Sequence, residues 1–162
     1  MTRPGSRLAL AAAAALALAA ANGDEEKRVL ARELEHAVAG YDAQAAEVVL
    51  GRARGAAAAG ETDVELRLLR VRAGLAVAEL LRIDFEGTPE AERTARTTLG
   101  QRIDAVAGEA LGLLPELPES SERFRMEADL VATMIRSDFR AKKLRGRLDE
   151  ATGRALALDP AN

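Results

Sequence analysis

The stretch TDVELRLLRVRAGLAVAELLRIDFEG, residues 62–87, contains the most apolar segment of the chain after the N-terminal run. Its first four letters have the spacing of a capping box. In that motif a threonine hydroxyl accepts a hydrogen bond from one free backbone N–H, and a glutamate carboxylate accepts one from another. The pattern therefore predicts a helix that starts at a cap formed by Thr62 and runs over residues 63–85.

Apolar residues of this segment fall on two stripes at helical spacing. One stripe contains Val64, Leu68, Val71 and Leu75, and the other contains Leu66, Leu69, Ala73, Val77 and Leu80. A helix with two apolar stripes contacts neighbours on two sides. We therefore expect this helix to be the central one of the fold.

Two helices are predicted before the central one. Apolar residues recur at helical spacing from Val29 to Tyr41, and Gly40 marks the end of that first helix. Asp42 has the side chain of an N-cap for a second helix. The residues of the second helix that we expect to face inward are Ala45, Val48, Val49 and Ala56.

Further helices are predicted after the central one. Gly87 ends the central helix, Thr88 caps the next, and Pro89 takes the first helical position, where no N–H is needed. The segment PELPES, residues 115–120, ends that fourth helix, and Ser120 or Ser121 caps the fifth. The predicted inward residues of the fifth are Phe124, Ala128, Val131, Ile135 and Phe139, and the last apolar stripe is Leu144, Leu148, Ala151, Ala155 and Leu158.

The last part of the chain has two interpretations. A continuous helix over residues 121–158 would be about 57 Å long. We favour the other interpretation, a break near Ser137-Asp138 that divides the segment in two, because the aspartate can cap a new helix there. With the break, the fold is all-α, with about six helices that form three antiparallel hairpins.

Composition supports the helical class and limits the chemistry. The 162 residues are 48% hydrophobic but only 2% aromatic, and alanine and leucine outnumber β-branched residues. The absence of cysteine excludes disulfides, thiolate metal sites and cysteine nucleophiles. A net charge of −3 gives no basic surface for nucleic acid, so no nucleic-acid partner is predicted.

Residues 1–21 have the pattern of a secretory signal peptide. Arg3 and Arg7 precede an uncharged apolar run over residues 8–21, and Ala19 and Ala21 fit the small-residue positions before a cleavage site. An uncleaved anchor, or an alanine-rich start of a soluble helix, is the alternative. The pattern predicts export, with the bacterial periplasm as the destination and residues 22–162 as one helical domain.

The segment GRLDEATGRALALDPAN, residues 146–162, resembles the closing half of a tetratricopeptide repeat. The resemblance implies that Ala155 allows close helix packing, that Leu156 and Leu158 fill a groove, and that Pro160 turns the chain toward a next repeat. It implies a degenerate, repeat-like array of helical hairpins. A chain truncated before its next repeat would show the same ending, and an unrelated bundle with this exit is the alternative.

No catalytic, cofactor-binding or metal-binding residues are predicted. His36 is the single histidine and lies off the apolar stripe of its helix. A general base needs an orienting partner and a nucleophile nearby, so a surface histidine is the better interpretation. The glycines of residues 51–60 lack the Lys-Ser/Thr pair of a phosphate loop. The sequence therefore does not predict an enzyme.

A basic cluster is the candidate binding site. If a helix continues through this region, Arg136, Arg140, Lys143 and Arg147 lie along one side of it at spacings of three and four. Such a cluster suits carboxylates of a partner protein or anionic lipid head groups at a membrane surface. A solvated basic face is the alternative interpretation.

The sequence thus predicts a non-catalytic, exported helical scaffold that binds a protein or peptide in the cell envelope, with no small-molecule substrate and no cofactor. Helical-repeat folds expose a surface whose side chains select such a partner. Two alternatives stay open. One is a closed helical bundle that holds a small apolar ligand. The other is an envelope structural protein that contacts anionic lipid through the basic cluster.

Overall fold

A computed structural model describes residues 23–59, 63–137 and 143–160, so the predicted signal peptide lies outside the described residues. Helices account for nearly all of these ranges, and none of their residues is in a strand. The helices cover residues 23–39, α2 (Ala43–Ala59), α3 (Val64–Gly87), α4 (Arg93–Leu113), the short 3₁₀ helix η1 (Leu114–Glu116), α5 (Ser121–Ser137) and α6 (Arg145–Leu158). This confirms the prediction of an all-α protein.

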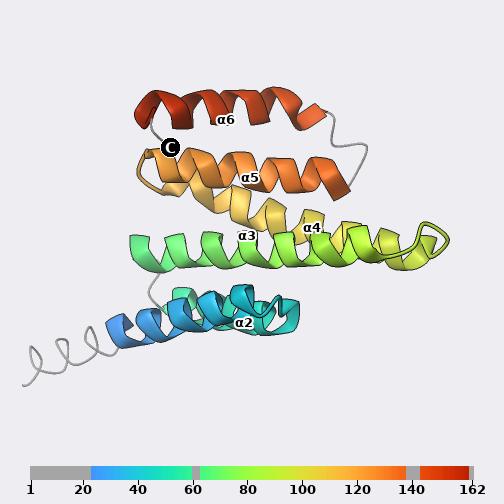
Figure 1. The fold of residues 1–162 in the computed structure, drawn as a ribbon. Helices are drawn as coiled ribbons and strands as arrows, with labels where there is room; N and C mark the ends of the chain where they lie inside the picture. Colours follow the sequence, from blue (N-terminus) through green and yellow to red (C-terminus); the bar gives the residue numbers. More distant parts are fainter. Residues whose placement is uncertain (1–22, 60–62, 138–142, 161–162) are drawn as a thin grey trace, which may run out of the picture.

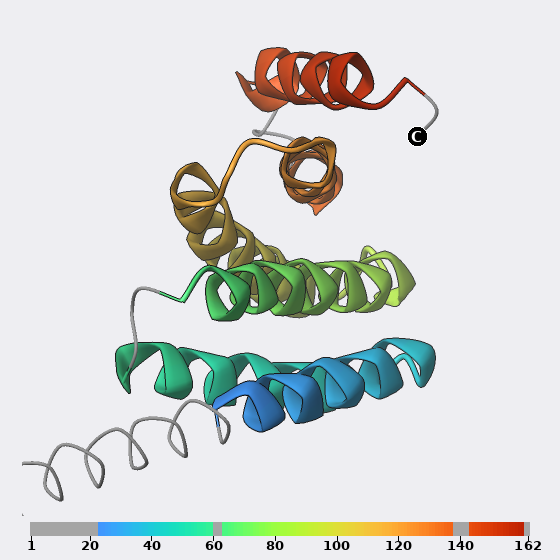
Figure 2. The ribbon, with the colours of Figure 1, turned by 90° about the vertical axis from the view of Figure 1, so that its left-hand side faces the viewer.

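The helices lie in layers, with α3 in the middle (Figures 1 and 2). The first helix and α2 form one end of the stack, and α5 and α6 form the other. Helix α3 contacts α2, α4 and α5, whereas α6 packs mainly against α5. The prediction that residues 63–85 form the central helix is confirmed.

The core packs against more than one side of α3, since Val71, Gly74, Ala78 and Leu81 are buried as well as the stripe that begins at Leu66. All five residues of the stripe that begins at Leu66 are buried. In the other stripe only Val71 is buried, and Val64, the first residue of α3, is 43% exposed. Buried Thr133 of α5 donates a hydrogen bond to Glu79 of α3, so this polar contact joins two layers without leaving the hydroxyl unsatisfied.

The N-cap of α3 differs from the prediction. Asp63, not Thr62, precedes the first helical residue, and its Oδ1 accepts from the N–H groups of Glu65 (2.9 Å) and Leu66 (3.3 Å). The helix begins one residue later than a threonine cap requires, so the aspartate occupies the capping position. The predicted cap at Asp42 is confirmed, since its Oδ1 accepts from the N–H of Ala45 at 2.9 Å.

Two predicted apolar faces are wrong in part. Val48 of α2 is 57% exposed, whereas Ala46, Val49, Leu50, Ala53 and Ala57 are buried. Alanines occur on every side of α2, so its hydrophobic pattern does not show which of two neighbouring faces is buried. In α6, Ala151 is buried but Leu156 and Leu158 are 48% and 55% exposed. The described helices leave both leucines about half exposed, so they are not the buried groove-filling residues that the resemblance implies.

The predicted break in the last segment is confirmed, because α5 ends at Ser137 and α6 begins at Arg145. The proposed cap at Asp138 and the inward position of Phe139 lie outside the described residues. None of the described helices combines the length and apolar character needed to cross a membrane.

The first helix ends in an unusual left-handed residue. Tyr41 has a φ of 54°, and its N–H donates to the carbonyl of Val38 at 3.2 Å. The N–H of Asp42 donates to the carbonyl of Ala37 at 2.9 Å, which completes the pattern of a Schellman motif. Glycine usually occupies the left-handed position of this motif, but here Gly40 precedes it.

Replacing Tyr41 with glycine is therefore expected to raise the free energy of unfolding by about 1 kcal/mol, because glycine adopts positive φ without the steric cost of a Cβ. The ring is 75% exposed, so its loss removes little packing. Urea denaturation followed by circular dichroism measures the change. Tyr41→Ala removes the ring but keeps the Cβ, so an equal gain in that variant would contradict the explanation.

Candidate functional site

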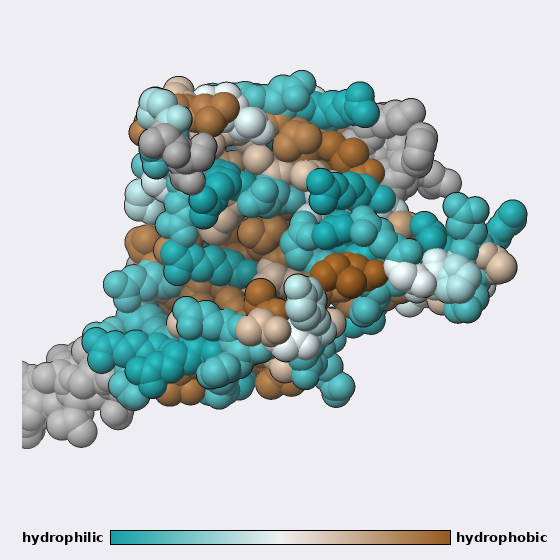
Figure 3. All heavy atoms as spheres, viewed as in Figure 1, coloured by the Kyte–Doolittle hydropathy of each residue, from teal (hydrophilic) through white to brown (hydrophobic). Residues whose placement is uncertain are grey.

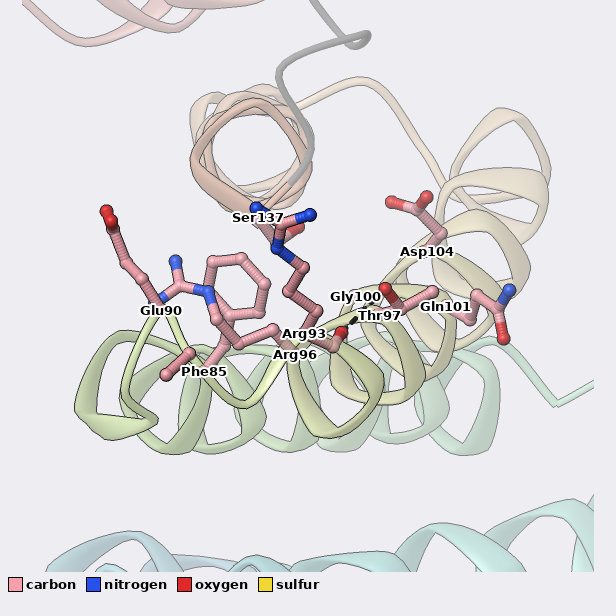
Figure 4. Close-up of a pocket in the computed structure, with 10 residues that line it drawn as sticks. Phe85, Glu90, Arg93, Arg96, Thr97, Gly100, Gln101, Asp104 and Ser137 are labelled. Atoms are coloured by element: carbon pink, nitrogen blue, oxygen red, sulfur yellow. Dashed lines mark hydrogen bonds between the residues drawn. The ribbon is translucent and has the colours of Figure 1, made fainter.

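The main groove lies where α3 ends, α4 begins and α5 ends. It has a volume of about 890 Å³, and its lining includes Phe85, Arg93, Arg96, Gln101 and Ser137. Figure 4 shows the side chains of Phe85, Arg93 and Arg96 on one side of the groove and those of Gln101 and Asp104 on the other. Three helix ends thus bring together residues that are as far apart in the sequence as Phe85 and Ser137.

The turn between α3 and α4 places these residues, and it differs from the prediction. Thr88 ends α3 instead of capping α4, because both its hydroxyl (2.7 Å) and its N–H (3.0 Å) donate to the carbonyl of Asp84. The N–H of Glu92 donates to the carbonyl of Pro89, and α4 begins only at Arg93. The later start makes Arg93 the first residue of α4 and places it on the groove.

Arg96 is held in place on the wall of the groove. Its Nη1 donates to the carbonyl of Thr88 at 2.8 Å, and its guanidinium lies 4.3 Å from the centre of the Phe85 ring. A guanidinium over an aromatic ring gains a cation–π attraction, and the hydrogen bond fixes its direction. Arg96 therefore presents its remaining donors in a defined orientation.

Gly100 lines the groove where α4 lies near the end of α5. A Cβ built there would lie 3.6 Å from the carbonyl oxygen of Ser137 and 3.9 Å from the Phe85 ring. A side chain at this position would therefore fill the space between α4 and the end of α5. Glycine leaves that space open.

The groove presents hydrogen-bond donors to a ligand. Its arginines and Gln101 supply donors for carboxylate or carbonyl oxygens, whereas the Thr97 hydroxyl already donates to the carbonyl of Arg93 at 2.8 Å. Among the residues that the structure describes, no three histidine, aspartate or glutamate side chains gather as metal ligands. His36 is exposed on the first helix, which is not part of this groove. The arrangement suits binding of a polar chain.

The four basic residues predicted as a binding stripe do not share one helix. Arg136 is exposed in the last turn of α5, next to Ser137 of the groove, and Lys143 is exposed just before α6. Arg147 is in α6, and its Nε donates to Glu127 of α5 at 2.6 Å. Arg140 lies outside the described residues. The prediction of a stripe assumed a continuous helix. Because the helix is broken after Ser137, these residues do not form a stripe along one helix.

Two smaller grooves lie elsewhere on the stack. One, of about 440 Å³, lies between the first helix and α3 and has Ala31, Leu68 and Leu69 among its lining residues. The other, of about 430 Å³, lies between α5 and α6 beside Phe124. On the face shown in Figure 3, hydrophilic side chains predominate and apolar side chains form small patches between helices. Charged rims over apolar patches are typical of surfaces that bind polypeptides.

Lys27 lines the groove between the first helix and α3. Its Nζ lies 2.7 Å from Asp24, 2.8 Å from Asp63 and 3.0 Å from Glu65. These carboxylates raise the pKa of Lys27 above its ordinary value. The hydrogen bond from Lys27, followed by those from the backbone N–H groups of Leu66 and Glu65, lowers the pKa of Asp63. The pair therefore ties the first helix to the cap of α3.

This network predicts a pH dependence that Asp63→Asn tests, since asparagine keeps the capping oxygen but removes the charge. A carboxyl group with a lowered pKa contributes stability above its ordinary pKa of 3.8, and the contribution is lost as the pH falls through the lowered value. At pH 6.5 the variant is expected to be about 0.2–1 kcal/mol less stable than the unaltered protein. Urea denaturation at pH 6.5 and pH 3 should show this difference shrinking at acid pH. An equal difference at both pH values would contradict the role of the charge.

Sequence reasoning missed the residues of the main groove. Gly87-Thr88-Pro89 was recognised as a helix boundary, but the helix that follows was predicted to start several residues too early. An arginine at i+3 from the start of a helix gives no signal that it will stack on the last aromatic residue of the preceding helix. Comparisons with protein-family models, curated proteins and solved structures found no match to this chain.

Proposed function

We propose that this chain is a non-catalytic helical scaffold that binds a protein or peptide partner in the cell envelope, after export and removal of residues 1–21. The observation that carries the proposal is the groove of about 890 Å³ at the ends of α3, α4 and α5, which is lined mostly by polar and charged side chains. A polypeptide offers the carbonyl, amide and charged groups that such a lining recognises.

The packing order of the helices supports a repeat-like array of three hairpins. Consecutive helices α3 and α4 pack together, as do α5 and α6, and α5 contacts both helices of the preceding pair. Hairpins that nest against their predecessor in this way build the extended surfaces of helical-repeat proteins. The resemblance of residues 146–162 to a tetratricopeptide repeat implies the same arrangement.

The two alternatives have less support. A closed bundle that holds a small apolar ligand requires a cavity lined mostly by apolar side chains, whereas exposed Glu90 and Arg93 line the main groove. A lipid contact through the basic cluster is weakened because Arg147 forms an ion pair with Glu127 of the same chain. A peptide partner fits the lining of the groove better than either.

Site-specific photocrosslinking tests the proposal. A photoreactive amino acid is placed at Gln101 or at Thr97, both exposed in the groove, and for comparison at Arg32, exposed on the first helix. The full chain is expressed in its native cell, the envelope fraction is irradiated, and adducts are identified by mass spectrometry. We expect one reproducible protein adduct at the two groove positions and a much weaker one at position 32.

Two outcomes would contradict the proposal. Adducts of equal yield at all three positions would mean random collision and not binding in the groove. If no protein adduct forms and a small metabolite instead co-purifies with the chain, the closed-bundle alternative would replace the scaffold. Full-length and cleaved forms are distinguished by N-terminal sequencing, which tests the predicted cleavage after Ala21 separately.

A further inference from the structure

The two arginines of the main groove differ in how they are engaged. Arg96 is fixed by the Thr88 carbonyl and the Phe85 ring. Arg93 lies three residues earlier on the same helix, is exposed, and forms no ion pair with another described residue. Many other arginines of the described part, such as Arg54 with Glu109 and Arg102 with Glu47, have a carboxylate partner within the chain. Arg93 therefore presents a guanidinium to the groove without a described internal counterion.

The charges in the groove are separated along α4. The guanidinium groups of Arg93 and Arg96 lie on one side, whereas Asp104 lies on the other (Figure 4). Glu90 also lines the groove near the arginines. This side of the groove therefore has two positive charges and one negative charge. A negative group is attracted to the arginine side of the groove. The electrostatics therefore favour one orientation of an acidic ligand.

We propose that the groove binds an acidic segment of the partner polypeptide, with a carboxylate on Arg93 and the adjoining chain extending past Gly100 toward Gln101. This rests on the proposed function and names the chemistry of its partner. A guanidinium binds a carboxylate through two parallel N–H···O bonds, which is stronger and more directional than a lysine contact. Arg96, already oriented, adds a second positive charge without further ordering of its side chain.

The carboxylate has two possible sources in a peptide, a side chain or the C-terminus. Three probes separate them: an acetylated and amidated peptide with three consecutive glutamates, the same peptide with glutamines, and the glutamine peptide with a free C-terminal carboxylate. Inorganic phosphate serves as a fourth probe for a site that binds any small anion. Each is titrated into the ¹⁵N-labelled full chain, and the backbone amide shifts of Thr97, Gly100 and Gln101 are followed by NMR.

We expect the glutamate peptide to shift these three amides and the blocked glutamine peptide to leave them unchanged. Arg93→Gln is expected to weaken the binding at least tenfold. The matched control Arg32→Gln removes an exposed arginine of the first helix and should leave the affinity unchanged. Because Arg93 has no described ion-pair partner and lies in the first turn of α4, its replacement should not lower the unfolding temperature.

The outcomes are distinct. Binding of the free-carboxylate peptide alone would assign the site to a C-terminus and keep Arg93 as its contact. Equal shifts from the glutamate and blocked glutamine peptides, or unchanged affinity in Arg93→Gln, would overturn the proposal. Phosphate binding as tight as the glutamate peptide would also overturn it, in favour of a small-anion site. If the probes fail but position 101 still crosslinks to one protein, the scaffold function stands and only the acidic ligand is wrong.

Discussion

Replacing Leu81 with alanine is expected to lower the free energy of unfolding by about 2–5 kcal/mol. Leu81 lies in α3 and is 1% exposed, in the helix that α2, α4 and α5 all contact. Removing its side chain loses the transfer free energy of the buried carbons. It also leaves a cavity, because the neighbouring helices relax only partly into the vacated space. A loss of this size is a large part of the total stability of a small domain.

Chemical denaturation followed by circular dichroism measures this change. Leu156→Ala is the matched control, because the same atoms are removed from a side chain that is 48% exposed on α6. The control should change the free energy of unfolding by less than about 1 kcal/mol, since surface substitutions away from packed contacts have small effects. Similar losses in the two variants would contradict the assignment of α3 as the centre of the core.

Replacing Gly74 with valine is expected to lower the free energy of unfolding by about 1–3 kcal/mol. A Cβ at this position would lie only 3.0 Å from the Cβ of Ala110 on α4. The two helices would have to separate, and the packing of Val106 beside this contact would be disturbed. Because glycine is a poor helix former, propensity alone predicts the opposite sign, so the result separates local from tertiary effects.

Gly108→Ala supplies the control for this prediction. Gly108 lies within α4, and a Cβ there would have no neighbour within 4 Å. Its replacement should therefore raise the free energy of unfolding by about 0.5–1 kcal/mol through helix propensity alone. If Gly74→Val also stabilised the protein, close contact between α3 and α4 at this position would be refuted.

Local sequence signals predicted several elements of the fold because the forces behind them act within one or two turns. The apolar stripe of α3 that begins at Leu66 is buried throughout, and Asp42 caps α2 as expected. Asp63, by contrast, displaced Thr62 as the cap of α3, since either side chain can accept the same N–H groups. The wrong face of α2 has a similar cause, because alanines on every side make its faces nearly equal in hydropathy.

The candidate site could not be predicted in the same way. The basic cluster around residues 136–147 stands out in the sequence, but the break after Ser137 and the pairing of Arg147 with Glu127 divide it. The groove instead combines residues 85–104 with Ser137 from a different helix. No pattern in either segment specifies that the end of α5 lies beside the start of α4.

The sequence by itself determined the helical class, the central position of α3 and the break before α6, because helix propensity, apolar periodicity and capping depend on near neighbours along the chain. Only the tertiary structure decided that Gly74 contacts Ala110, that Arg96 stacks on Phe85, and that Arg93 faces an open groove. The physical reason is that these contacts depend on how whole helices pack. That packing is set by the combined shape of many side chains and not by any single local motif.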